Sequence, residues 1–556
     1  MVNGCFLQVA ATRRHLFCLL MVLLIPFFGM NAQPAGPHLE TRDGATRLIV
    51  SGEPYLCIAG ETGNSASGSV AYMETLWSAL RQINLNTVLV PVSWEMVEPQ
   101  EGKFDFSIVD GLIGQARREG VKLSLLWFGS WKNMVSSYAP SWVKTNRSRF
   151  PLLQDKNGGQ IQMLSVFSDN NIQADARAFA ALMRHIREVD AAEQTVIMMQ
   201  VENEVGYSFG ERDWSDLARK AWRASVPREL TAYLAARRDS LIPEFRAYWE
   251  SLGARTSGSW AELFGDTPAG NEIFMSYHYA KYIGAVVAAG KKEYDIPMFA
   301  NASIGRQDRK IATYPCGGPI PFVMDIWQCA APQLDAISPD IYYGDFEGHC
   351  RAYTQNGNPL IIPETRGDDV GLGRALLAYA EHGALCFSPF GIEGYAGRTI
   401  GSFYADMQQL APLVLTRAPG KTMRAVMVGP DTTEQTLEIG KYRVLCEYGH
   451  RGSQPAGETV GYALILQAED DSFYVYGRNI SLQFSLVDRG RNKLVTGILD
   501  CEEGSFEDGT WKPTRRLNGD QIMNDYTFDK AYLDGRSGNG LRFGRAGVQY
   551  VKLYQY

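Results

Sequence analysis

Two glutamates follow apolar runs of the kind that form buried strands. Glu204 comes shortly after the run 195–201, and Glu364 directly follows the run 360–363. An ionised carboxylate at the end of a buried strand is costly unless it faces a cleft, a cation or a hydrogen-bond donor. A facing pair of carboxyl groups can hydrolyse a glycoside, because one attacks the anomeric carbon while the other, kept protonated, donates to the departing oxygen. The alternative is a pair of structural ion pairs, with Glu364 bound to Arg366 or another arginine.

Other acidic residues lie at the ends of predicted strands. Glu61 follows the first strand and can accept hydrogen bonds from sugar hydroxyls, or be a capped or paired loop residue. Glu202 alternates with Glu204 along the chain, so we expect it to be a buried residue that supports the site. Glu393 follows the eighth strand, where we expect it to line the rim.

Three tryptophans cluster after the second and third predicted strands. Trp94, Trp127 and Trp131 stand where an indole face can stack on the apolar face of a pyranose. Core packing is the alternative for each of them. We expect a substrate-binding role, strongest for Trp127 and Trp131, which share one strand end.

The elements that would position these residues repeat along the chain. Short apolar runs alternate with stretches of helical period, which predicts βα units and a parallel sheet. Eight runs qualify as strands: 55–59, 87–92, 121–128, 195–201, 297–301, 336–341, 360–363 and 384–387. We therefore predict an α/β fold, a (β/α)8 TIM barrel over 46–415, with its active site at the carboxyl ends of the strands.

The rest of the chain predicts three further parts. Short alternating runs separated by Gly, Asp and Asn predict an antiparallel β-sandwich over 416–556. Two arginines before the apolar run 16–28 predict a signal peptide over 1–32, followed by a linker over 33–45. An uncleaved anchor helix is the alternative reading of that run. We expect export to the periplasm or the extracellular space, and a mature protein that does not bind the membrane.

Composition and motifs exclude several classes of protein. The 556 residues carry 54 Lys plus Arg against 61 Asp plus Glu, a net charge of -7, which argues against nucleic acid as a partner. HExxH, P-loop and GxSxG patterns do not occur, and carboxylates need no metal or organic cofactor for this chemistry. Seven of the nine cysteines lie beyond the signal peptide, without a CxxC pair. Cys316 and Cys329 are near enough in sequence to pair, although we expect buried thiols.

Several segments resemble glycoside hydrolase family 35, the β-galactosidases of clan A. Residues 200–206 (QVENEVG) are similar to the acid/base motif of that family, and residues 92–106 (VSWEMVEPQEGKFDF) to its second-strand signature. Residues 338–342 (SPDIY) resemble its sixth strand. Residues 517–520 (LNGD) resemble the carboxyl-terminal β domain of a bacterial subgroup. The run 127–133 (WFGSWKN) differs from the residues usual in the family.

The resemblance implies a role for each matching residue. Glu204 would be the acid/base and Glu364 the nucleophile. Asn203 would contact the sugar 2-hydroxyl, and Tyr342 would position the nucleophile. The implied function is a retaining exo-β-glycosidase, namely a β-galactosidase that removes terminal β-galactosyl groups from plant oligosaccharides such as xyloglucan fragments.

Two alternatives stay open. The same carboxylates can serve a β-glucoside, β-fucoside or α-L-arabinoside, or the barrel can bind carbohydrate without catalysis. The expected partner is an oligosaccharide in each case, and a homodimer is one expectation for the quaternary structure.

Overall fold

The structure is a computed structural model that describes residues 36–42, 44–304, 314–449, 460–522 and 536–556. Ala35–Tyr556 forms one compact unit. The other unit, Met1–Pro34, contains the predicted signal peptide and lies outside the described residues. No helix in the described ranges combines the length and the apolar character needed to cross a bilayer.

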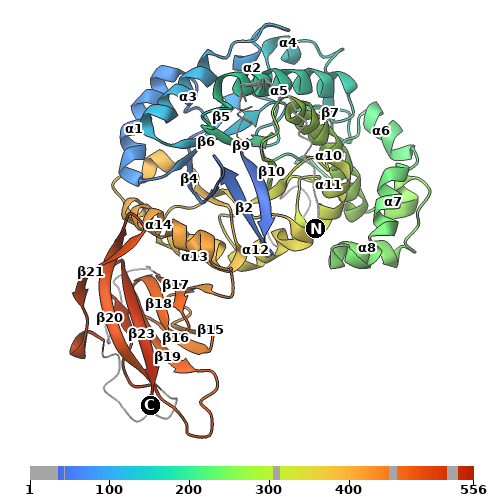
Figure 1. Ribbon diagram of the computed structural model, residues 1–556. Helices are drawn as coiled ribbons and strands as arrows, with labels where there is room; N and C mark the ends of the chain where they lie inside the picture. The colour runs from blue at the N-terminus through green and yellow to red at the C-terminus, as the bar shows by residue number, and fades with distance from the viewer. Residues whose placement is uncertain (1–35, 43, 305–313, 450–459, 523–535) are drawn as a thin grey trace, which may run out of the picture. The chain divides into compact units, whose positions relative to one another are not determined.

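Eight parallel strands form a barrel (Figure 1). They are β4 (Cys57–Glu61), β5 (Thr87–Ser93), β6 (Lys122–Phe128), β9 (Val196–Val201), β10 (Met298–Ser303), β11 (Ala336–Asp340), β12 (Ile361–Thr365) and β13 (Cys386–Pro389). Their order around the sheet is β11-β10-β9-β6-β5-β4-β13-β12. A bridge between Ile341 and Thr365 joins the two end strands, where the Ile341 N–H donates to the Glu364 carbonyl at 3.0 Å. The predicted barrel fold and all eight predicted strands are confirmed.

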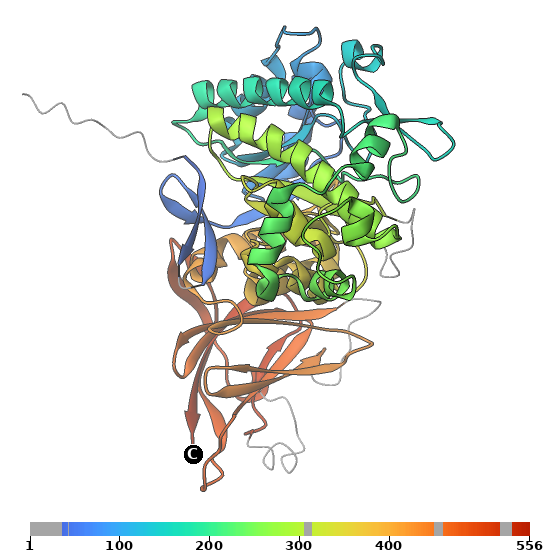
Figure 2. The same cartoon turned by 90° about the vertical axis from the view of Figure 1, so that its right-hand side faces the viewer.

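Helices cover the outer face of the barrel (Figure 1). Since every residue of β5 is buried, its side chains must meet apolar neighbours on both faces of the sheet. The covering helices are α1 (Val70–Ile83), α3 (Ser107–Glu119), α5 (Asp169–Asp190), α10 (Pro268–Glu293), α11 (Met324–Ala330), α12 (Phe346–Tyr353), α13 (Asp369–His382) and α14 (Thr399–Thr416). The two longest, α5 and α10, lie side by side (Figure 2).

A small antiparallel sheet precedes the barrel. It consists of β1 (His38–Arg42), β2 (Ala45–Val50) and β3 (Glu53–Tyr55). Leu48 and Val50 of β2 belong to the same apolar cluster as the inward-facing Cys57 and Ala59 of β4. The predicted linker over 33–45 therefore contains a strand. This strand, β1, pairs with β2. Gly44 permits the tight turn between them, because its φ of 78° lies in a region that favours glycine.

Longer connections follow three of the strands on the side where each strand ends. The helix α2 (Trp94–Val97) follows β5, and α4 (Ser141–Lys144) with the hairpin β7 (Leu152–Gln154) and β8 (Gln160–Leu164) follows β6. Four helices lie between β9 and α10: α6 (Asp216–Arg223), α7 (Arg228–Ala236), α8 (Pro243–Ser251) and α9 (Trp260–Phe264).

Two antiparallel sheets follow the barrel. One has the order β14 (Met423–Val428), β17 (Gly461–Glu469), β18 (Ser472–Arg478), β23 (Gly547–Gln555), β20 (Thr496–Glu507) and β21 (Thr510–Arg516). The other contains β15 (Glu434–Ile439), β16 (Tyr442–Tyr448), β19 (Ile480–Leu486) and β22 (Leu541–Phe543). Both contribute to one apolar cluster, as a sandwich requires. On α13, Glu381 accepts hydrogen bonds from the Arg424 guanidinium at 3.0 Å and the Ala425 N–H at 2.6 Å.

The seven cysteines in the described ranges are free thiols, and six of them are buried. Cys316 donates to the Glu211 carbonyl at 2.8 Å instead of pairing with Cys329. The predicted alternative of buried thiols is the one that the structure shows.

We expect Leu182→Ala to destabilise the barrel by about 2–5 kcal/mol, because it removes a fully buried side chain of α5 and leaves a cavity. Urea denaturation measures this change. The matched control is Leu217→Ala on α6, where the side chain is 40% exposed and the expected change is within about 0.5 kcal/mol. Equal losses in the two variants would contradict the packing derived above.

Candidate active site

The catalytic pair predicted from the sequence lies at the carboxyl ends of the barrel strands. Glu204 follows β9, and Glu364 is the second-last residue of β12. One carboxylate oxygen from each of Glu204, Asp340 and Glu364 lies within 4.8 Å of the others. A retaining glycosidase holds its two carboxyl groups about 5–5.5 Å apart, so this spacing suits a double displacement.

Two neighbours hold the carboxylate of Glu364. The Asn203 Nδ2 donates to its Oε1 at 3.2 Å, and the Tyr342 hydroxyl donates to its Oε2 at 2.9 Å. Burial, followed by the negative charge of Glu364, raises the pKa of Tyr342 far above its ordinary value, so this hydroxyl stays a donor. Arg366 pairs with Asp368 rather than with Glu364, so the predicted alternative of a Glu364–Arg366 ion pair does not occur.

The segment that carries Glu204 leaves β9 in an unusual backbone conformation. Glu202 and Glu204 have φ of 63° and 44°, a left-handed region that non-glycine residues rarely adopt. Hydrogen bonds hold the segment: the Glu204 N–H donates to Asn301 Oδ1 at 3.0 Å. Such strain persists only where its surroundings fix it, and it clusters at functional sites.

The surroundings of Glu204 favour its protonated form. Burial raises the pKa of Glu204, and repulsion from Glu364 raises it further. The positive charge of Lys132 and hydrogen bonds from Ser303 and Asp340 oppose that shift. A carboxyl group whose surroundings raise its pKa matches the needs of a general acid.

Glu61 ends β4 and is fully buried. Neither of its carboxylate oxygens has a hydrogen-bond partner in the described part of the chain. Burial raises the pKa of Glu61 well above its ordinary value, and Glu364 adds to this. Buried polar atoms are seldom left unsatisfied, so these oxygens suit hydroxyl donors of a ligand.

Glu393 lies near Glu61, in the short helix η4 (Ile392–Tyr395) after β13. It is half-buried, and its Oε1 accepts a hydrogen bond from the Gly63 N–H at 3.1 Å. Its charge contributes to the raised pKa of Glu61. The structure therefore brings Glu393 to the edge of the carboxylate cluster.

Glu202 is a buried residue that supports the site, as its alternation with Glu204 along the chain predicted. It is fully buried, and its carboxylate accepts the backbone N–H groups of Ser130 and Trp131 at 3.1 and 2.7 Å. Burial and the neighbouring Asp175 raise the pKa of Glu202 well above its ordinary value. These bonds join the end of β9 to the segment after β6.

The three predicted tryptophans do not present a face to a sugar. Trp94, Trp127 and Trp131 are at most 1% exposed. Trp94 donates to Glu98 at 2.9 Å and Trp127 to Asp175 at 2.9 Å, each from the indole nitrogen. The Trp131 ring packs edge-on against Tyr279 and Tyr282. The predicted stacking roles are therefore wrong for this conformation, because the indoles fill the core behind the strand ends.

Two residues of the site, Asp340 and Lys132, were not assigned a role from the sequence. Asp340 ends β11 and accepts a hydrogen bond from Asn301 Nδ2 at 2.8 Å, while its buried Oδ1 has no hydrogen-bond partner among the described residues. Burial, then repulsion from Glu364, raises the pKa of Asp340 well above its ordinary value. Lys132 lies 3.7 Å from Glu364 Oε1. Each ends or follows an apolar strand, the same signal that singled out Glu204.

Within the part of the chain that the structure describes, Glu204, Asp340 and Glu364 also approach one another closely enough to hold a cation. Donors already surround them: Asn203 and Tyr342 on Glu364, and Asn301 on Asp340. With the ammonium group of Lys132 beside them, these carboxyl groups suit hydrogen bonds with the hydroxyl groups of a ligand.

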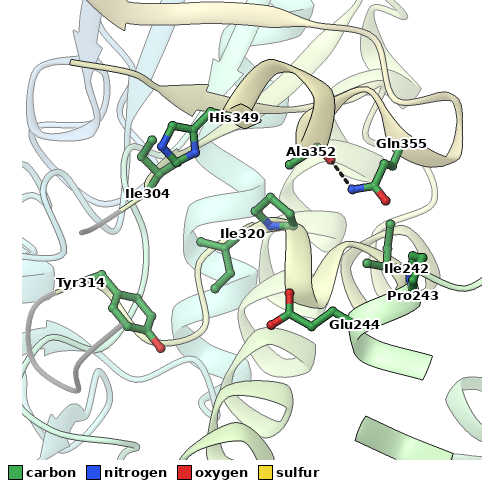
Figure 3. A pocket seen from close by; sticks show the side chains of 10 residues that line it. Ile242, Pro243, Glu244, Ile304, Tyr314, Ile320, His349, Ala352 and Gln355 are labelled. Carbon is green, nitrogen blue, oxygen red and sulfur yellow. Dashed lines mark hydrogen bonds between the residues drawn. The ribbon is translucent and has the colours of Figure 1, made fainter. Parts of the chain in front are cut away.

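A separate cavity of about 370 Å³ lies beside α8 and α12 (Figure 3). Its lining includes Ile242, Ile304 and Ile320, and none of the carboxylates of the site. The carboxylate cluster is therefore not part of the lining of this cavity.

Two segments of the chain match family models. Residues 68–264 match the glycoside hydrolase family 42 model described as "Beta-galactosidase", and residues 400–528 match one described as "Domain of unknown function (DUF5597)". Glu204 falls within the first match, and Glu364 lies outside both. The chain is thus similar to the family 42 model over residues 68–264, whereas the predicted resemblance was to family 35.

Relatives with known names are distant. A "Beta-galactosidase" of Xanthomonas manihotis is 27% identical over a stretch that covers 24% of this chain and 27% of that one. The β-galactosidase of the psychrophilic Marinomonas ef1 is 13% identical with a TM-score of 0.42, covering 64% and 60% of the two chains. The catalytic domain of β-amylase from Paenibacillus polymyxa gives 13% and 0.44, covering 62% and 96%. The chain thus spans about a quarter of the curated relative.

We expect Glu61→Gln to reduce the loss of stability with rising pH. The raised pKa of Glu61 means that the folded state keeps a proton that the unfolded state releases, so the free energy of unfolding falls as pH rises above the ordinary glutamate range. Glutamine imitates the protonated form and removes this contribution. Urea denaturation from pH 4 to pH 8 measures the slope, with the exposed Glu74→Gln as control. A slope in Glu61→Gln as steep as in wild type would contradict the derivation.

Proposed function

We propose that this protein is a retaining exo-β-glycosidase, a β-galactosidase that removes terminal β-galactosyl groups from plant oligosaccharides such as xyloglucan fragments. The observation that carries the proposal is the approach of Glu204 and Glu364 to within 4.8 Å at the mouth of the barrel. The match of residues 68–264 to a model described as "Beta-galactosidase" supports the sugar. The xyloglucan substrate and the assignment to family 35 rest on the sequence motifs.

The proposed reaction has two steps. Glu364 attacks the anomeric carbon while Glu204 transfers its proton to the glycosidic oxygen, which leaves as an alcohol. Glu204, now ionised, then takes a proton from water, and the water oxygen displaces Glu364 from the anomeric carbon. Net retention follows from two inversions. The raised pKa of Glu204 supports its role as the acid in the first step.

The burial of the site supports exo action. Glu61, Asp340 and Glu364 are at most 6% exposed, and carboxylates buried to this degree suit the end of a chain better than its interior. The carboxylate oxygens of Glu61 and Asp340 that have no partner among the described residues would then accept hydrogen bonds from the hydroxyl groups of that sugar.

We also propose export to the periplasm or the extracellular space. Support comes from the segment 1–32, in which Arg13 and Arg14 precede an apolar run. Sequencing the amino terminus of the mature protein tests this, with a start near residue 33 expected. Protein that keeps Met1 and stays in the cytoplasmic fraction would contradict it.

Incubation with a 2-deoxy-2-fluoro-β-galactoside that carries an activated leaving group should trap a glycosyl-enzyme, and peptide mapping should place the sugar on Glu364. Glu364→Gln should lower turnover by several orders of magnitude. Glu204→Gln should slow natural glycosides by about 10²–10⁴-fold and activated aryl glycosides less, because these leaving groups need no proton. The exposed Glu438→Gln is the matched control and should retain wild-type rates.

A panel of aryl β-galactoside, β-glucoside, β-fucoside and α-L-arabinoside tests the sugar. The galactoside should give the highest kcat/KM, and a last place for it would overturn the substrate. Wild-type protein that hydrolyses none of them yet retains oligosaccharides on a column would favour a binding protein. A label on a residue other than Glu364 would refute the assigned nucleophile.

A further inference from the structure

A buried lysine lies in the middle of the carboxylate cluster. Lys132 follows β6 on the segment Ser130–Trp131–Lys132, and its side chain is only 5% exposed. Its Nζ lies 2.9 Å from Asn203 Oδ1, 3.7 Å from Glu364 Oε1 and 5.0 Å from the centre of the Phe128 ring. Among the ion pairs of the described residues, only this one involves a carboxylate of the cluster.

The charge of Lys132 acts on the whole cluster. Burial of an ammonium group is costly unless opposite charges compensate it. Here the compensating groups come from four parts of the barrel: Glu61 from β4, Glu204 after β9, Asp340 from β11 and Glu364 from β12. The positive charge of Lys132 opposes the rise in pKa of Glu61, of Glu204 and of Asp340. Tyr342 faces Glu364, and Glu393 faces Glu61.

Lys132 also decides the orientation of Asn203. An ammonium group only donates hydrogen bonds, so the amide oxygen of Asn203 must face it. The amide nitrogen then points to Glu364 Oε1, 3.2 Å away. The reverse orientation would set a nitrogen against the ammonium and an oxygen against the carboxylate, both repulsive.

We propose that Lys132 is a positioning residue, which fixes the amide of Asn203 as a donor toward Glu364 and places a positive charge 3.7 Å from the carboxylate of this nucleophile. The inference rests on the proposed function, because it assigns Lys132 a task in that reaction. It acts through Asn203 and Glu364 and needs no contact with the substrate.

The test is the pH dependence of kcat/KM for an aryl β-galactoside in Lys132→Met. This variant removes the positive charge that lies 3.7 Å from Glu364 Oε1 and leaves the negative charge of the cluster less compensated, so the acid limb should move up by about one to three pH units. Below that limb the variant should lose about tenfold in kcat/KM for each unit of the shift. Lys132→Arg keeps the charge and should keep the limb within about half a unit of wild type, even if its larger head lowers kcat.

A second measurement uses folding rather than turnover. The cluster binds protons more tightly without Lys132, so the free energy of unfolding of Lys132→Met should fall more steeply with rising pH than that of wild type. Lys132→Arg should keep the wild-type slope. The control Lys144→Met removes a lysine that pairs with Glu95 on α2, and should change neither slope nor limb.

The outcomes separate the two proposals. Active wild type with an unmoved acid limb in Lys132→Met overturns the inference and leaves the proposed function standing. Wild type that hydrolyses and traps no glycoside refutes the proposed function, and the slope of unfolding then decides the electrostatic role. If Lys132→Met does not fold, Lys132→Gln replaces it, and a limb and slope equal to wild type again overturn the inference.

Discussion

The site depends on how the barrel buries acidic groups that would otherwise repel one another. Glu61, Glu204, Asp340 and Glu364 converge on one end of the barrel with Lys132 among them. Burial and mutual repulsion favour protons on the first three, as their raised pKa values show. Because four carboxyl groups surround one lysine, several hydrogen-bond donors and acceptors lie in a small volume. A proton-transfer reaction requires such an environment.

The backbone keeps this arrangement in place at the junctions between strands. Closure of the barrel at Ile341 and Thr365 sets the ends of β11 and β12 side by side, which brings Asp340 and Tyr342 to Glu364. The strained turn after β9 is held by the bonds of Glu202 to the segment after β6. Each functional side chain is therefore fixed by a neighbouring strand and not by its own loop alone.

The second domain is continuous with the barrel in its packing. The match to the domain of unknown function begins at residue 400, inside α14, a helix that covers the barrel. The Tyr404 hydroxyl of that helix donates to the Ala59 carbonyl of β4 at 2.6 Å, and Glu381 of α13 binds β14. The β sheets thus contact α13, the helix that follows β12, and β12 is the strand that carries Glu364.

The sequence by itself determined the eight strands, the order of the parts and the acidic residues at the strand ends. Apolar runs and their periods are local features of the sequence. A carboxylate at the end of an apolar run is also a local feature, so each such residue can be recognised by itself. Glu204, Glu364 and Glu61 were found in this way. The sequence could not tell a core tryptophan from one that binds sugar, because Trp94, Trp127 and Trp131 differ from a stacking platform only in what surrounds them. Nor could the sequence show that Lys132 contacts Asn203 and Glu364, because Asn203 lies 71 positions further along the chain and Glu364 lies further still. Only the closed barrel decided which charges share a site, since electrostatic energy depends on distance and burial and not on separation in sequence.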